Sequence, residues 1–348
     1  MSVLDVDPVP ATKGAPTPWA QVAAVVVLLT VAVGVLLTAF GLPAVRSSVH
    51  AVPIALAGPS VATDRIAAAL EERRPGAFET LAVPDTAAAE AAIVDREVYG
   101  AIDVSGGRPE VVVATAASPA VAQTLQALAA GLAAPGEATA PSATVRELVP
   151  LPAADPRGIG LAAGSLPLVI GGVLAAVVLT LRVRGAARRL VGALAFAMTG
   201  GLALVAILQF WFGSLGGDYW TNAGAVALSV AATALILLGL EAVMGLPGIG
   251  LGAAVLLLVG NPLSGSASAP EMLPGWSGTL GRLLPPGAGA SLLRSTAFFD
   301  GAGATQPVLV LLAWFSLGLV LFAVGAVRSG RARLTVARRE STVTAAPV

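Results

Sequence analysis

The sequence lacks cysteine and has almost no histidine or lysine: His50 and Lys13 are the only residues of their kinds. The missing cysteine excludes a disulfide framework, a thiol nucleophile and a cysteine-ligated metal site. A single histidine excludes a zinc site of the H-E-x-x-H type. The residue before Lys13 is Thr12, where a phosphate-binding P-loop requires glycine, so the chain has no ATPase site of that kind. No serine lies in a G-x-S-x-G motif. We therefore expect no enzyme activity, no catalytic residues, no metal and no cofactor.

Charge is also scarce. Only 11% of the 348 residues are charged, against about 25% in soluble domains, while 56% are hydrophobic. The 20 basic residues balance the 20 acidic ones, which argues against a nucleic-acid partner because such binding requires a basic surface. The mean hydropathy of +0.86 excludes a disordered chain. The composition predicts a polytopic α-helical membrane protein with room for one modest soluble domain.

Six segments approach the roughly 20 apolar residues that a transmembrane helix needs. These predicted spans are residues 19–42, 159–181, 190–212, 221–240, 243–259 and 307–327. The first apolar run is longer than that of a signal peptide, so we interpret it as an uncleaved anchor. The fifth span is short and rich in glycine, and its Gly248 and Gly252 have the spacing of a helix–helix contact.

Arginine sets the predicted orientation, because short cytoplasmic loops carry the positive charge of membrane proteins. The loop between the second and third spans contains Arg182, Arg184, Arg188 and Arg189. The C-terminal segment 328–348 has five more arginines, whereas the loop 213–220 has no basic residue. With six spans, the tails 1–18 and 328–348 both face the cytoplasm. Residues 43–158 then lie outside, and residues 159–327 form a five-helix transmembrane bundle.

The segment 43–158 has the pattern of an α/β domain, in which apolar strands alternate with helices. Asp85 is placed to cap the second helix. The predicted strands are residues 52–56, 77–83, 98–104, 110–114 and 143–150, and the predicted helices are residues 61–73, 86–96 and 119–132. Residues 133–142, rich in alanine, proline and glycine, are predicted to be a linker.

A proline-rich stretch, residues 261–303, is too polar to span a bilayer and too apolar to be a free loop. We predict two short helices in it, residues 276–284 and 288–299, forming a hairpin that re-enters the membrane or lies in its interface. It is either a plug that seals helix ends or part of a substrate exit gate. Arg294 is expected to be buried and to need a partner, for which Glu271 and Asp300 are the nearest acidic residues in the sequence.

The order of these segments resembles a known family of membrane proteins. The fifth span continues into Asn261-Pro262-Leu263-Ser264-Gly265, and this is followed by Met272-Leu273-Pro274, Leu284-Pro285-Pro286-Gly287 and Leu293-Arg294-Ser295. The external segment contains Glu97-Val98-Tyr99-Gly100-Ala101. Together with one span, a large external domain and five further spans, this pattern resembles the YhgE/Pip (phage infection protein) branch of the ABC-2 type permeases.

The resemblance implies the transmembrane subunit of an exporter in a bacterial plasma membrane. Such a subunit pairs with itself or a relative, as a homodimer or heterodimer, and is energised by a separate ATP-binding subunit. The outer gate would involve Asn261, Pro262, Gly265, Pro274, Pro285, Pro286, Gly287 and Arg294. The cytoplasmic contact would involve Arg182, Arg184, Arg188 and Arg189. The alternative is a non-transporting membrane-anchored protein, similar to a phage receptor, whose external domain binds a ligand or partner.

Overall fold

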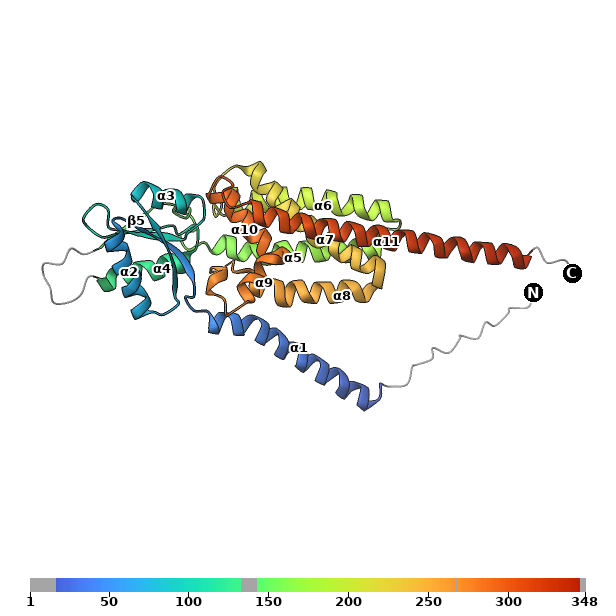
Figure 1. Ribbon diagram of the computed structural model, residues 1–348. Coiled ribbons are helices and arrows are strands. Elements are labelled where there is room, and N and C mark those ends of the chain that lie inside the picture. The colour runs from blue at the N-terminus through green and yellow to red at the C-terminus, as the bar shows by residue number, and fades with distance from the viewer. Residues whose placement is uncertain (1–16, 133–142, 267, 345–348) are drawn as a thin grey trace, which may run out of the picture.

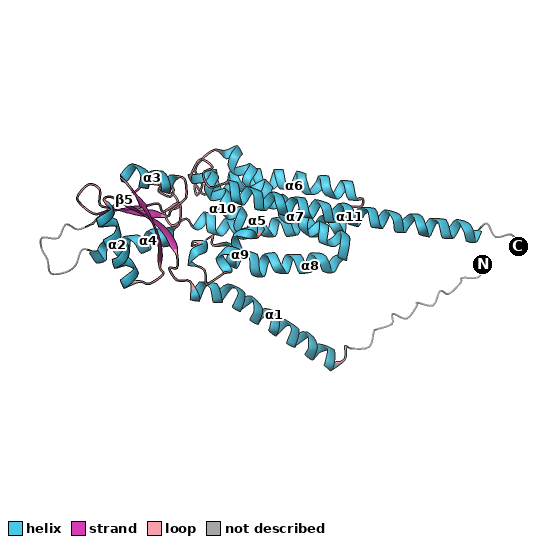
Figure 2. Cartoon of the chain, in the orientation of Figure 1, coloured by secondary structure: helices cyan, strands magenta, loops and turns pink. Residues whose placement is uncertain are grey.

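The computed structural model describes residues 17–132, 143–266 and 268–344, and they form an α/β domain at one end of a bundle of long helices (Figure 1). We call the bundle end beside this domain the domain end and the opposite one the far end. The predicted linker 133–142 lies outside the described residues. Figure 2 shows that strands are confined to the domain. The predicted combination of a mostly helical chain with one small α/β region is thus confirmed.

The domain has five strands and three helices, close to the predicted segments. Its elements are β1 (Val52–Ala57), α2 (Ser60–Arg73), β2 (Phe78–Val83), α3 (Thr86–Val94), β3 (Gly100–Asp103), β4 (Glu110–Val113), α4 (Pro119–Leu132) and β5 (Thr144–Glu147). The sheet order is β2-β1-β3-β4-β5. All neighbours are parallel except the antiparallel pair β3–β4. The carboxylate of Asp85 accepts a hydrogen bond from the amide of Ala88 at 2.9 Å, which confirms the predicted helix cap.

Strand β1 is buried on both faces, as expected for a strand with parallel neighbours on each side. Ile54 and Leu56 pack in a cluster with Val121 and Leu125 of α4. The alternate residues of β1 belong to a second cluster with α3. The pleat thus separates two cores. The second core also contains Phe299 of the hairpin, residues 261–303, which lies much later in the sequence. The domain is therefore not packed independently of the rest of the chain.

Among the residues that the structure describes, five helices are long and apolar enough to cross a membrane. They are α1 (Trp19–Arg46), α5 (Ile159–Arg182), α6 (Ala186–Ala206, continued by the π-helical turn η1, Ile207–Trp211), α7 (Tyr219–Met244) and α11 (Thr305–Thr344). The described start of α1 and the end of α11 both lie at the far end (Figure 1). Helix α1 slants away from the other helices and touches mainly the segment after α8.

The predicted span 243–259 is not confirmed as a full crossing. It forms α8 (Leu246–Val255) and a π-helical turn, η2 (Leu256–Gly260), which together have 15 residues. At about 1.5 Å per residue this is roughly 22 Å, short of a hydrocarbon core of about 30 Å. Its start is set by Gly245, whose φ of 75° ends α7, and by Pro247 in the first turn.

Helix α7 is the centre of the bundle and is buried along most of its length. Each neighbouring helix approaches it through a glycine. A Cβ atom at Gly172 of α5 would lie 2.6 Å from Thr233, and one at Gly201 of α6 would lie 2.8 Å from the carbonyl oxygen of Ala223. Gly248 and Gly252 of α8 also face α7, as predicted for a helix contact. Close backbone approach at these glycines therefore adds to the packing of the buried apolar side chains in the bundle.

The hairpin, residues 261–303, is built from two 3-10 turns and two α-helices. They are η3 (Pro262–Ser264), η4 (Pro270–Met272), α9 (Ser277–Leu283) and α10 (Pro285–Phe298). The two predicted short helices are confirmed, with slightly different ends. Helix α10 is almost entirely buried and packs against α7, α11 and α5. The hairpin therefore closes the domain end of the bundle.

Candidate functional site between the domain and the hairpin

The domain and the hairpin are joined by polar contacts as well as by the shared cores. The Tyr99 hydroxyl donates a hydrogen bond to Glu271 Oε2 at 2.7 Å. The other oxygen of Glu271 forms an ion pair with Arg282 Nη1 at 3.2 Å. Glu271 lies on η4 and Arg282 on α9, so one carboxylate ties the domain to two elements of the hairpin.

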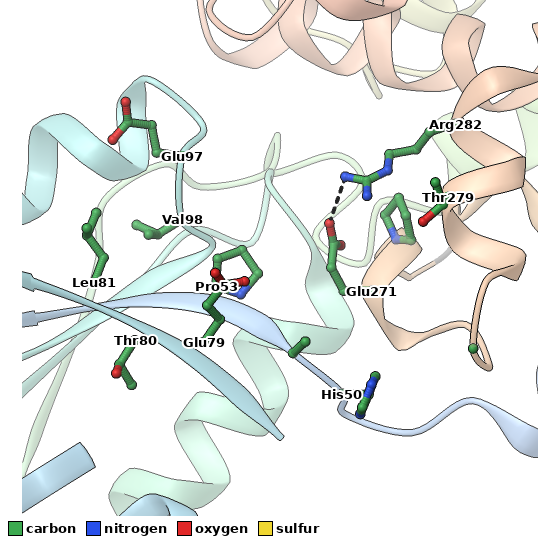
Figure 3. Close-up of a pocket in the computed structure, with 13 residues that line it drawn as sticks. His50, Pro53, Glu79, Thr80, Leu81, Glu97, Val98, Glu271, Thr279 and Arg282 are labelled. Carbon is green, nitrogen blue, oxygen red and sulfur yellow. Dashed lines mark hydrogen bonds and ion pairs between the residues drawn. The ribbon is translucent and has the colours of Figure 1, made fainter. Parts of the chain in front are cut away.

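A cavity of about 530 Å³ lies between the hairpin and the β1–β2 side of the sheet (Figure 3). Glu271, Arg282 and Thr279 line it on the hairpin side, whereas Glu79 and Val98 line it on the domain side. The only histidine of the chain, His50, lies just before β1 and also faces this cavity; Figure 3 shows it close to the hairpin. The cavity is therefore lined by both acidic and basic groups.

A second cavity, of about 220 Å³, shares several of these residues and extends towards α10. Arg96 reaches into it from the turn after α3, where its φ of 62° is unusual for a residue with a side chain. Its guanidinium donates to the carbonyl oxygen of Ser291 at 3.1 Å and to the hydroxyl of Ser295. It also lies 5.5 Å from the ring centre of Phe299, within the range of a cation–π contact.

Burial shifts the pKa values of two domain residues at this cavity, Arg96 and Tyr99. It lowers the pKa of Arg96, although the negative charge of Glu271 acts in the opposite direction. Burial, together with the charge of Glu271 and the hydrogen bond to it, raises the pKa of Tyr99 well above its ordinary value. Tyr99 therefore remains a protonated phenol that donates to the carboxylate at neutral pH.

Arg294 of α10 faces the same cavity and is only 5% exposed. Its Nη2 donates to the carbonyl oxygen of Ser266 at 2.9 Å, while its Nε has no partner among the described residues. The expectation that Glu271 or Asp300 pairs with it is wrong. Glu271 forms an ion pair with Arg282 and accepts a hydrogen bond from Tyr99, and Asp300 is exposed beyond the end of α10. A buried arginine here is held by a backbone carbonyl instead of a carboxylate.

The other hairpin residues predicted for an outer gate are mostly brought together. Pro285, Pro286 and Gly287 form the buried first turn of α10. Gly287 lies against Ser264 of η3, close to Pro262 and to Gly265, whose φ is 64°. Asn261, just before them, has a buried side-chain oxygen without a partner in the described structure. Pro274 lies apart from this group, half-buried at the start of α9, where its carbonyl accepts from Ser277.

The arginines predicted for a cytoplasmic contact lie together at the far end but differ in exposure. Arg182, Arg184 and Arg188 are exposed. Arg189 instead forms an ion pair with Glu241 at 3.2 Å and donates to the carbonyl oxygen of Thr180 at 2.9 Å. It thus fixes the end of α5 against α7. A cavity of about 710 Å³ lies beside this pair, bounded also by α11.

Sequence reasoning missed Arg96 and Tyr99 as site residues. Tyr99 lies in a motif that supported the family resemblance, and Arg96 directly precedes that motif. Nothing in their local pattern indicates a contact with the hairpin, whose contact residue lies 195 positions later for Arg96 and 172 positions later for Tyr99. In the described ranges, no group of three His, Cys, Asp or Glu residues is arranged to hold a metal ion. The arrangement offers guanidinium, phenol and hydroxyl donors, which suit recognition of a polar or anionic ligand.

Comparison with known proteins found no match: no protein-family model, curated protein or solved structure matches this chain.

Proposed function

We propose that the chain is the transmembrane subunit of an ABC-2-like exporter that is energised by a separate ATP-binding subunit. The observation that carries this proposal is the pair of cavities at opposite ends of the bundle, separated by the tightly packed α7. One of about 220 Å³ faces the domain and α10, and the other, of about 710 Å³, faces the far end. Such an arrangement suits alternating access, in which one end opens while the other stays closed.

In this proposal, α8, its π-helical turn and the start of the hairpin that packs against them together make a sixth crossing. The domain is then extracytoplasmic and both termini are cytoplasmic in a bacterial plasma membrane. The charges support this orientation. The exposed Arg182, Arg184 and Arg188 lie at the far end, whereas the loop between α6 and α7, at the domain end, has no basic residue. The hairpin, with α10 inserted between spanning helices, acts as the outer gate.

The energy source in this proposal is a partner, because the chain has no P-loop and its spans have few ionisable groups. Arg189 and Glu241 neutralise one another at the far end. The exposed arginines and the adjacent cavity supply a surface on which an ATP-binding subunit docks. ATP binding there would favour one of the two states of a dimer of permease subunits.

The orientation can be tested by single-cysteine labelling, because the chain has no cysteine of its own. Gly106 is exposed in the β3–β4 turn, and Ala187 is exposed in the arginine-rich turn at the far end. We expect Gly106→Cys to react with a membrane-impermeant maleimide in intact cells. Ala187→Cys should react only after permeabilisation. Labelling of both positions from the same side would contradict the proposed topology.

The energy source can be tested by capturing the tagged chain from its native membrane and measuring ATP hydrolysis. The chain alone, reconstituted in lipid, should not hydrolyse ATP, whereas the captured complex should contain an ATP-binding subunit and do so. Arg184→Glu should reduce the amount of that subunit, because it reverses a charge on the proposed docking surface. Arg65→Glu, on an exposed part of α2, is the matched control. Hydrolysis by the isolated chain, or capture without an ATP-binding subunit, would contradict the proposal.

A second function is favoured by the cavity of about 530 Å³ in Figure 3. It lies between the domain and the hairpin and requires no passage through the bundle. A ligand bound there would make the chain a non-transporting, membrane-anchored binding protein. Ligand binding without any associated ATP-binding subunit would favour this alternative over export.

A further inference from the structure

Two arginines face the 220 Å³ cavity without an acidic partner. In the described part of the chain, ion pairs involve Arg146, Arg189 and Arg282, but neither Arg96 nor Arg294. Arg96 donates hydrogen bonds to a carbonyl and a hydroxyl, which are both neutral. Arg294 donates one to a carbonyl, and its Nε has no partner among the described residues. The two arginines line the same cavity.

The acidic groups around the cavity do not neutralise this charge. Glu271 has both oxygens occupied, by Tyr99 and by Arg282. Glu97 also lines the cavity but is exposed to solvent. The positive charge of Arg96 and Arg294 therefore exceeds the negative charge available to them. Burying unpaired charge is costly, so a site with this composition is stabilised by an anion that enters it.

Arg294 also forms part of the wall of a neighbouring cavity of about 220 Å³, between α5 and the end of the domain. Its side chain thus lines two cavities although it is buried. The cavity between the domain and α10 is also lined by two residues with hydroxyl groups, Ser264 and Ser291. Guanidinium and hydroxyl groups that line one cavity suit the several oxygen atoms of a phosphate group.

The position of the cavity suits a group at the surface of the membrane. It is bounded by Gln306, in the first turn of α11, and by the hairpin, whose Trp276 is exposed at the same end of the bundle. Tryptophan is enriched where a helix bundle meets the lipid headgroups. A phospholipid headgroup and a soluble phosphate ester are therefore both candidate ligands.

We propose that the cavity between the α/β domain and α10 is an anion-binding site, in which Arg96 and Arg294 hold the phosphate group of a phosphoester. The site does not depend on the chain being a transporter. A lipid headgroup and a soluble phosphate ester share this chemistry, and the experiment separates them.

The experiment measures binding to the full chain in neutral detergent with two probes. Inorganic phosphate represents a soluble ligand, and short-chain phosphatidylglycerol represents a headgroup, with phosphatidylcholine of equal chain length as the zwitterionic comparison. Arg294→Gln removes the buried charge and should weaken binding about tenfold or more, as expected for losing a charged hydrogen bond. Arg65→Gln makes the same change in net charge at an exposed position and should have no effect.

A second variant keeps the test decisive if Arg294→Gln does not fold. Glu271→Gln removes the negative charge that competes with the ligand but keeps an oxygen that accepts the hydrogen bond from Tyr99. This variant should therefore bind phosphate or phosphatidylglycerol more tightly than the natural chain does. Saturation by phosphate alone would identify a site for soluble phosphoesters, and binding of phosphatidylglycerol alone would identify a lipid site. No binding of either probe, or equal binding by the Arg294 and Arg65 variants, would overturn the proposal.

Discussion

Replacing Gly318 with alanine is expected to destabilise the bundle by about 1–3 kcal/mol, the usual cost of forcing an extra carbon into a packed core. A Cβ atom at this position of α11 would lie 2.5 Å from the amide nitrogen of Ile236 and 2.5 Å from the carbonyl carbon of Leu235. Both atoms belong to the backbone of α7, which cannot move aside as a side chain does. The free energy of unfolding in detergent, measured by chemical denaturation, would report the loss.

The matched control is Gly250→Ala in α8, where a Cβ would meet nothing within 4 Å. Alanine favours a helix over glycine by about 0.5–1 kcal/mol, so this variant should be as stable as the natural chain or slightly more so. The two variants make the same chemical change with opposite expected signs. Equal effects would show that helix propensity, and not the contact with α7, determines the outcome.

The importance of α7 could not be predicted from the sequence. Its apolar content is similar to that of the other spans, and a helix side facing lipid is as apolar as one facing protein. The extent of each span follows from hydrophobicity, which is why the predicted spans lie close to α5 and to the apolar part of α11, Thr305–Arg328. Which span occupies the centre depends on where the glycines of other helices meet it, as at Gly172 of α5 and Gly318 of α11.

The strands of the domain could be predicted because their pattern is local. The apolar run of β1 and the capping Asp85 each act within a few residues of the chain. The candidate site is the opposite case. Tyr99 and Glu271 are separated by 172 positions, and no periodicity links them. The presence of a buried Arg294 could be expected from the apolar residues beside it, but its partner depends on the path of the hairpin.

Replacing Glu271 with alanine is expected to destabilise the docking of the domain on the hairpin by about 1–4 kcal/mol. Leaving a buried hydrogen-bonding group such as the Tyr99 hydroxyl without a partner costs about 1–3 kcal/mol. The ion pair with Arg282 adds about 0–1 kcal/mol, because that arginine is 40% exposed. The variant also removes the carboxylate whose charge acts on the buried Arg96. Unfolding in detergent without added phosphate is the measurement.

The control is Glu79→Ala, which removes an exposed carboxylate from the same 530 Å³ cavity and should change stability by less than about 0.5 kcal/mol. A double-mutant cycle with Tyr99→Phe then separates the hydrogen bond from the general loss of negative charge. If the bond to Tyr99 carries the effect, the second substitution should cost little once Glu271 is gone. Strictly additive effects of the Glu271 and Tyr99 substitutions would mean instead that Glu271 acts through its charge on the arginines. Equal effects of the Glu79 and Glu271 variants would exclude both the hydrogen bond and this charge as the cause.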